Sequence, residues 1–312
     1  DGYVGKPPEL GTGVFAMDAG NGSSTIPTFD SGFPVDFAFN RQPASIESWY
    51  TSARLIQGKY LHTNTTATKA SDGGAVFDSN VGYYKNSSSA YQGWMWKRHA
   101  GFDVVAYEGN ANSSGSVTDL TVSHNLGRVP EMMWIKNMDT AYEWYVYHKG
   151  LNGGSNPQNY TIQLSTANAE ANDGSTTWQG KAPTSTHFTL GGHYVVNKEN
   201  NTSLAMLFAS VAGISKVGSY TGSGSGNTQT IELGFQPRFV IIKDYTGNSN
   251  PWYTMDTTRG WGSGNDKQLA LNDTYAQLSN DWGAPTSTGF TVTGGGINLN
   301  LSSNKYIYYA HA

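Results

Sequence analysis

Cysteine is absent from the 312 residues of this sequence, which excludes disulfide bonds, thiolate metal sites and a cysteine nucleophile. Charged residues are also scarce, at 13% of the chain, where soluble domains usually carry about a quarter. The net charge is −4 and no basic run occurs, so a nucleic-acid groove has no electrostatic support and we expect no nucleic-acid partner. No apolar stretch approaches the ~18 residues of a membrane span, so we expect no membrane insertion.

Motifs for catalysis and for metal binding are missing as well. The 7 histidines form no His-Glu-x-x-His pattern, and no Gly-x-Ser-x-Gly elbow marks a serine nucleophile. Most of the 23 acidic residues stand in turn contexts, and no pair is marked out as the two carboxylates of a glycosidase. The glycine-rich run 222–227 lacks the spacing of a dinucleotide-binding fingerprint and predicts a hairpin loop. We therefore expect no catalytic residues, no metal site and no cofactor.

Glycine and aromatic residues, by contrast, are abundant. The 38 glycines imply many turns, and the 13% of aromatic residues supply ample material for a packed core. The apolar segments are short, rich in β-branched and aromatic residues, and separated by Gly, Asn, Ser and Pro, and none sustains a helical period. The sequence therefore predicts an all-β fold. It begins at Asp1 without an initiator methionine, so we expect it to be part of a longer or processed product.

An internal repeat is the strongest pattern in the sequence. The run 182–186 recurs letter for letter at 284–288, and 129–136 parallels 236–243. Further pairs follow in the same order: Trp49-Tyr50, Trp144-Tyr145 and Trp252-Tyr253; Arg54, Lys149-Gly150 and Arg259-Gly260; and the opening turns Tyr3-Val-Gly5, Tyr107-Glu-Gly109 and Tyr220-Thr-Gly222. The runs beginning at Trp94, Leu204 and Tyr306 close the three copies. The repeat predicts three tandem antiparallel β-sandwich or barrel-like modules at residues 1–100, 101–213 and 214–312.

The tryptophans fall into two groups with different expected roles. Those of the repeated Trp-Tyr pairs fill the same place in each copy, which favours core packing, because each copy must rebuild its own interior. Three others lie in stretches rich in Gly, Asn and Ser, and we expect them to be exposed faces that stack against sugars: Trp178, Trp261 and Trp282. Polar neighbours that could bond sugar hydroxyls are Gln179, Asn265, Asp266 and Asp281.

Several runs of this sequence resemble a module of marine bacteriophage structural proteins. They are residues 96–109, with the letters WKRHAGFDVVAYEG, residues 123–127 followed by 130–133, residues 211–222, and the ending 306–312. The resemblance covers nearly the whole chain, is specific in the last two copies, and is weakest between Lys6 and Ser24. It implies a tail-associated or fibre-like virion protein and brings no known catalytic or binding residues.

From composition, repeat and resemblance together we expect a non-catalytic protein of the virion exterior, serving as tail fibre, spike or decoration. Its role would be structural support, host adsorption or both. The expected partners are other virion proteins and a glycan or protein receptor on the host surface. By analogy with phage fibres we expect a homo-oligomer, specifically a trimer. Two other classes stay open: a secreted or cell-surface bacterial carbohydrate-binding (lectin-like) protein, and a polysaccharide depolymerase carried on a tail.

Overall fold

The computed structural model describes residues 10–22, 26–71, 75–85, 88–112, 119–224, 226–247, 249–294 and 299–312. Nearly all of its regular structure is antiparallel β, which confirms the predicted all-β class. The α-helix in these residues is a single turn, α1 (Tyr194–Asn197), and there are five 3₁₀ turns: η1 (Gly11–Gly13), η2 (Arg54–Ile56), η3 (Leu151–Gly154), η4 (Pro157–Asn159) and η5 (Thr257–Arg259).

Three large sheets organise the described chain. The first has the order β1-β8-β3-β4, with β1 (Phe15–Ala19), β3 (Phe37–Arg41), β4 (Tyr50–Ala53) and β8 (Gln92–Trp96). The second is β14-β13-β12-β11-β16-β9, with β9 (Phe102–Glu108), β11 (Met132–Asn137), β12 (Tyr145–His148), β13 (Tyr160–Gln163), β14 (Ala171–Asn172) and β16 (Thr202–Phe208). The third is β17-β24-β19-β20-β21-β22, with β17 (Ser215–Thr221), β19 (Phe239–Asp244), β20 (Tyr253–Asp256), β21 (Asp266–Ala270), β22 (Leu278–Asn280) and β24 (Lys305–His311).

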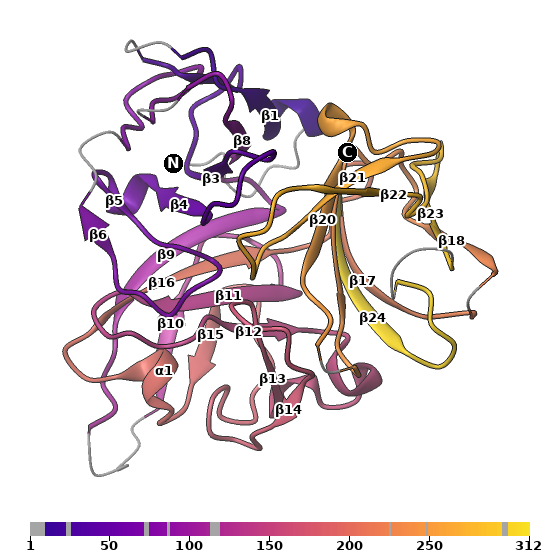
Figure 1. Ribbon diagram of the computed structural model, residues 1–312. Helices are drawn as coiled ribbons and strands as arrows, with labels where there is room; N and C mark the ends of the chain where they lie inside the picture. The colour runs from indigo at the N-terminus through magenta and orange to yellow at the C-terminus, as the bar shows by residue number, and fades with distance from the viewer. Residues whose placement is uncertain are drawn as a thin grey trace.

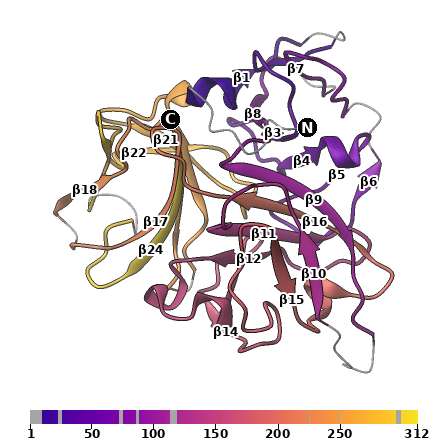
Figure 2. The same cartoon turned by 180° about the vertical axis from the view of Figure 1, so that it is seen from behind.

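Each large sheet takes its strands from one of the stretches 1–100, 101–213 and 214–312, called here the first, second and third segments. The last long strand of each segment (β8, β16 or β24) lies between two earlier strands of the same segment. The three sheets stand around one centre rather than in a row (Figures 1 and 2). The opening turn predicted at Tyr3-Val-Gly5 lies outside the described residues.

The centre of the molecule is a hydrophobic core shared by all three segments. Strand side chains alternate between the two faces of a sheet, so every second residue points inward. In β16, Leu204, Met206 and Phe208 join the shared core, whereas Ala205 and Leu207 belong to a separate cluster on the outer face. The other long strands follow the same alternation, and the shared core contains aromatic residues from each sheet.

Shorter two-stranded sheets add an outer layer to the large ones. They pair β2 (Phe29–Asp30) with β7 (Gly82–Tyr83), β5 (Lys59–Tyr60) with β6 (Ala70–Ser71), β10 (Leu120–Ser123) with β15 (His187–Leu190), and β18 (Thr228–Glu232) with β23 (Gly289–Thr293). Phe188 of β15, for example, packs with Met133 and Leu207 of the second sheet. Outer clusters of this kind are present in all three segments.

The segments are joined in a ring by hydrogen bonds that run in one direction. The indole N–H of each repeated tryptophan donates to a backbone carbonyl of another segment. The three bonds are Trp49 to Ala270 at 2.7 Å, Trp144 to His62 at 2.8 Å, and Trp252 to Gln163 at 2.8 Å. The first segment therefore bonds to the third, the second to the first, and the third to the second. This cycle closes the ring of three segments.

Buried cationic side chains near the ends of β3, β11 and β19 form a second cycle of bonds between segments, in the same order as the tryptophans. Arg41, Lys136 and Lys243 are each 0% exposed. Each donates to a carbonyl in a loop of another segment: Arg41 to Thr274 at 3.0 Å, Lys136 to Thr66 at 3.1 Å, and Lys243 to Ala167 at 3.0 Å. Burial lowers the pKa of both lysines to about 8 and that of Arg41 to about 10. These cations hold the three interlocked loops in place.

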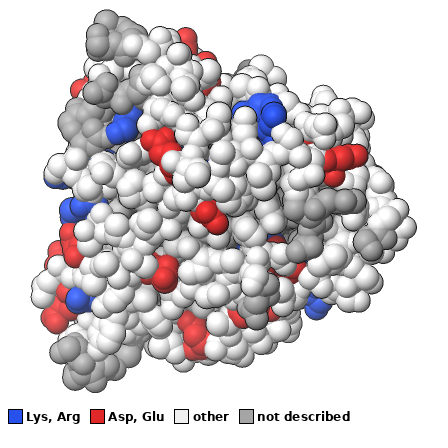
Figure 3. All heavy atoms as spheres, viewed as in Figure 1, with Lys and Arg blue, Asp and Glu red and all other residues white. Residues whose placement is uncertain are grey.

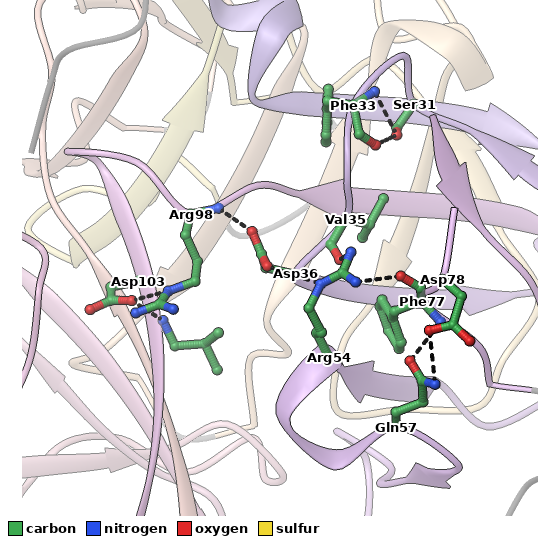
Figure 4. Close-up of polar contacts among 11 residues, drawn as sticks. Ser31, Phe33, Val35, Asp36, Arg54, Gln57, Phe77, Asp78, Arg98 and Asp103 are labelled. Carbon is green, nitrogen blue, oxygen red and sulfur yellow. Dashed lines mark hydrogen bonds and ion pairs between the residues drawn. The ribbon is translucent and has the colours of Figure 1, made fainter. Parts of the chain in front are cut away.

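Charged side chains also join the first segment to the second. Asp36 accepts the backbone N–H of Arg98 at 2.8 Å and pairs with Arg54 at 3.3 Å (Figure 4). The guanidinium of Arg98 in turn donates to the buried carboxylate of Asp103 at 2.6 Å. Because carboxylates accept hydrogen bonds readily, Asp36 satisfies the backbone N–H of Arg98, which lies in the connection between β8 and β9.

The second segment repeats the Asp36 arrangement, and the third alters it. Glu131 accepts the backbone N–H of Ser210 at 2.7 Å and pairs with Lys149. The corresponding residue of the third segment is Arg238, which donates to the carbonyls of Phe15 and Ala312, both at 2.9 Å. The backbone bond of Lys149 to Glu131 corresponds to that of Thr257 to Arg238. The alignment of Lys149 with Arg259 is therefore wrong by two residues.

Replacing Arg41 by leucine is expected to destabilise the interlocked loops. The change removes the donor to the carbonyls of Asp273, Thr274 and Tyr275, at a cost of about 2 kcal/mol. Hydrogen exchange at residues 270–277 should become faster, whereas Arg128→Leu, at an exposed arginine, should leave it unchanged. Equal exchange of this loop in the wild type and in Arg41→Leu would contradict the assigned role.

Candidate functional site

The three tryptophans expected to be exposed are buried, so that expectation is wrong. Trp178, Trp261 and Trp282 are 1%, 3% and 1% exposed. Trp178 and Trp261 also donate their indole N–H groups to the carbonyls of Tyr160 and Gly283. The loops that carry them fold back over the outer faces of the second and third sheets, where the rings fill the outer clusters. Their Gly, Asn and Ser neighbours form the turns and do not mark exposure.

The polar neighbours of these tryptophans serve the loops rather than a ligand. Asp266 is 0% exposed and accepts the backbone N–H groups of Gly262 and Trp282. Asp281 accepts the N–H of Gly283. The side-chain amide of Gln179 bonds Asp119. The loops around Trp261 and Trp282 thus use their carboxylates internally, as turn residues commonly do.

Four histidines are buried, and burial lowers the pKa of His124 and, more strongly, of three others. His99, His148 and His311 are 3%, 0% and 0% exposed, and burial lowers the pKa of each to about 3. His99 and His148 each accept, at Nδ1, the backbone N–H of the glycine two residues later. These contacts make the three histidines part of the scaffold. Among the described residues, no three His, Asp or Glu side chains gather closely enough to hold a metal ion.

A group of partly exposed aromatic side chains lies on the outer face of the first sheet. It consists of Tyr50, Tyr60 and His62, called here the outer aromatic cluster. The ring centroids lie 5.3 Å apart for Tyr50 and Tyr60, 5.2 Å for Tyr50 and His62, and 5.1 Å for Tyr60 and His62. Tyr50 lies on β4, the edge strand of the first sheet, and Tyr60 lies on β5, which is further toward the outside of the molecule (Figure 1). Three rings at this edge present both apolar area and polar atoms to solvent.

Sequence and pairing explain how these rings come together. Thr51 pairs with Leu61 through two backbone hydrogen bonds, and both side chains point toward the interior. Their neighbours Tyr50, Tyr60 and His62 consequently point to the outer face, because successive strand residues alternate. His62 Nδ1 donates to the carbonyl of Trp49 at 2.7 Å, which fixes the ring and leaves Nε2 as an acceptor.

One cation and one carboxylate flank the outer aromatic cluster. The ammonium of Lys85 lies 4.8 Å from the ring centroid of Tyr50 and 5.4 Å from that of Tyr60, within the range of cation–π attraction. Burial lowers the pKa of Lys85. Glu47 accepts the hydroxyl of Tyr91 and the N–H of Gln42, and it follows burial as a cause of the raised pKa of Tyr50.

Other aromatic side chains contact the corresponding tyrosines of the second and third sheets. The ring of Tyr145 lies 5.0 Å from that of His193, which precedes α1. Tyr253 is only 7% exposed and stacks on Trp282 at 6.0 Å. In the first sheet a lysine side chain takes the place of these outer-layer rings. The repeated Trp-Tyr pairs predicted core packing, and this is confirmed for the tryptophans. Because adjacent residues of a strand point to opposite faces, alternation could have shown that the tyrosines do not share the core with them.

Two shallow depressions lie at corresponding places, one in the second segment and the other between the third segment and the start of the first. One, of about 330 Å³, is lined by Pro130, Glu131 and Lys149 among others. The other, of about 460 Å³, is lined by Pro237, Arg238 and Thr257 among others. Both are wide open, and three of the charged side chains in them, Glu131, Lys149 and Arg238, already bond to the protein. We therefore place the candidate site at the outer aromatic cluster.

Comparison with known proteins adds one finding. A family model described as Domain of unknown function (DUF7483) matches residues 19–312. No curated protein and no solved structure matches the chain. None of the helices in the described residues has the length and apolar character needed to span a membrane.

Proposed function

We propose that this chain, which belongs to the family Domain of unknown function (DUF7483), is a non-catalytic bacteriophage virion surface protein with a structural and host-adsorption role. One observation carries the proposal: a closed ring of three segments that, in the described chain, presents a partly exposed cluster of three aromatic rings on the first segment. Buried tryptophans and cations form that ring. A rigid scaffold that presents a few contact side chains suits adhesion.

The surface agrees with this role. Charged side chains are scattered singly or in small groups over the face seen in Figure 3, and most of that face is uncharged. In salt water, exposed ion pairs are screened and add little to stability. A particle protein that takes its stability from buried aromatic residues and sheet hydrogen bonds is therefore insensitive to the salt around it.

The proposal includes the finer architecture and the assembly. We take each segment as one copy of a β-sandwich module, formed by a large sheet and the shorter strands that pack on its outer face. The partners are other virion proteins and a receptor on the host surface, and the site of action is the virion exterior. A homotrimer is the expected assembly, by analogy with phage fibres.

Immunogold electron microscopy of the source material, with antibody raised against this chain, tests the proposal. We expect gold on phage particles. Gold on tails favours adsorption, and gold on heads favours a decoration role; either supports a virion protein. Gold on cells without particles would overturn the proposal and favour a cell-surface lectin. Release of reducing ends from host polysaccharide would instead indicate a depolymerase.

A further inference from the structure

We propose that the outer aromatic cluster binds a neutral sugar ring of a host-surface glycan. This inference adds a ligand class to the adsorption role proposed above. That the glycan belongs to the host cell rests on that role. The ligand class is inferred first from geometry: three rings lie at mutual distances of 5.1–5.3 Å on an outer sheet face.

The rings supply the apolar part of such a site. Tyr50, Tyr60 and His62 each keep part of their surface exposed, at an edge where β5 pairs only with the short strand β6 in the described chain. Pairs within the cluster are tilted by 57° to 74°, so the rings form walls of a corner rather than a flat stack. The C–H faces of a pyranose can lie against one such wall while its edge contacts another.

Polar atoms suited to hydroxyl groups surround these rings. His62 Nε2 is an acceptor, because Nδ1 carries the proton that bonds Trp49. Among the described residues, no hydrogen bond engages the phenol hydroxyl of Tyr50 or of Tyr60. Each phenol can therefore donate to and accept from a sugar hydroxyl. A site with both kinds of group is typical of small polar ligands held by an aromatic platform.

The flanking charges favour a neutral ligand. The ammonium of Lys85 already lies against Tyr50 and Tyr60, so it repels a second cation. The carboxylate of Glu47, which accepts hydrogen bonds from Tyr91 and Gln42, supplies a negative charge that offsets part of the attraction of Lys85 for an anion. An uncharged ring with several hydroxyls avoids the repulsion by Lys85. The cluster therefore suits a hexopyranose better than an amino sugar with a free amine.

Only the first segment offers this arrangement in the described chain. In the second, Tyr145 contacts His193, and in the third, Tyr253 stacks on Trp282. The residues equivalent to His62, which accept the indole hydrogen bonds in the other segments, are Gln163 and Ala270. Neither is aromatic. Three copies of the module thus yield one sugar site per chain, and a multivalent particle would supply the avidity.

Saturation-transfer NMR with the full chain tests the inference directly. The probes are methyl hexopyranosides of gluco, galacto and manno configuration, followed by a glycan array for the extended ligand. We expect saturation transfer to ring C–H protons from at least one probe. Tyr60→Ala should weaken binding at least about tenfold, and Tyr60→Phe, which keeps the ring and loses the hydroxyl, should weaken it less.

Tyr194→Ala is the matched control, because Tyr194 is an exposed tyrosine (36%) distant in sequence from the cluster. Its binding should equal that of the wild type, and the melting temperatures of all variants should agree. Absence of saturation transfer from every probe, or equal binding by the wild type and Tyr60→Ala, would overturn the sugar site. Gold on virions together with absent sugar binding removes only this inference. Sugar binding together with gold on cells alone removes the virion role and leaves the site.

Discussion

Replacing Trp144 by alanine is expected to lower the free energy of unfolding by about 4 kcal/mol, within the range for truncating a buried tryptophan. Trp144 is 0% exposed and lies in the core shared by all three segments. The change leaves a cavity at the centre and removes the donor to the carbonyl of His62, which belongs to another segment. Because such bonds join the three segments, we expect the substitution to destabilise all three sheets.

Urea unfolding followed by circular dichroism measures the loss, and hydrogen exchange shows how far it extends. We expect one cooperative transition at a lower urea concentration, with faster exchange in β4 and β20 as well as in the second sheet. Trp144→Phe keeps much of the packing and should recover more than half of the loss. Faster exchange restricted to residues 101–213 would show that the segments are stable independently and would contradict the shared-core account.

Lowering the pH from 7 to 4.5 is expected to destabilise the protein by several kcal/mol through its buried histidines. The pKa values of His99, His148 and His311 are about 3 in the folded protein, against 6.5 for a free side chain. Between these values the unfolded chain binds the proton and the folded chain does not. Stability is therefore complete above pH 6.5 and falls continuously down to about pH 3, by about 2–3 kcal/mol per histidine at pH 4.5.

Carboxyl groups whose pKa is raised by burial oppose part of this loss, because they bind protons more readily in the folded protein: Asp18, Glu170, Asp173 and Asp266. A variant isolates the histidine contribution. In His148→Asn the side-chain oxygen can still accept the N–H of Gly150, and the titrating group is gone. The difference in unfolding free energy between pH 7 and 4.5 should shrink by about 2–3 kcal/mol. His187→Asn, at a partly exposed histidine, is the control, and an unchanged difference in His148→Asn would contradict the assignment.

Much of the fold could be predicted from the sequence because the repeat fixes the order of strands. Short β-branched and aromatic runs gave the all-β class, and the Trp-Tyr pairs identified corresponding places in the three segments. The closed ring could not be predicted, since it depends on which loop carbonyl receives each indole N–H. Ala270, His62 and Gln163 share no side-chain feature, because only their backbone is used. Backbone acceptors leave no trace in residue identity.

The candidate site was harder to predict for a related reason. Trp178 and Trp282 stand among turn residues, which suggested exposure, but composition does not reveal that their loops fold back onto a sheet. Tyr50 stands beside a core tryptophan and was grouped with it, although adjacent strand residues face opposite sides. Whether an outward tyrosine is then covered depends on the outer layer, here Lys85 in the first segment and Trp282 in the third.

The one-way cycle of indole hydrogen bonds also limits how such a protein can change over generations. In an open solenoid an additional repeat extends the stack, because each unit needs only its neighbours. Here every segment both gives and receives a bond, and Trp252 completes the circuit by returning to Gln163. A fourth copy would find no partner unless the whole ring widened. Adding a fourth segment by gene duplication would therefore break this ring. New binding specificity is expected instead from substitutions in the outer layer of one of the three segments.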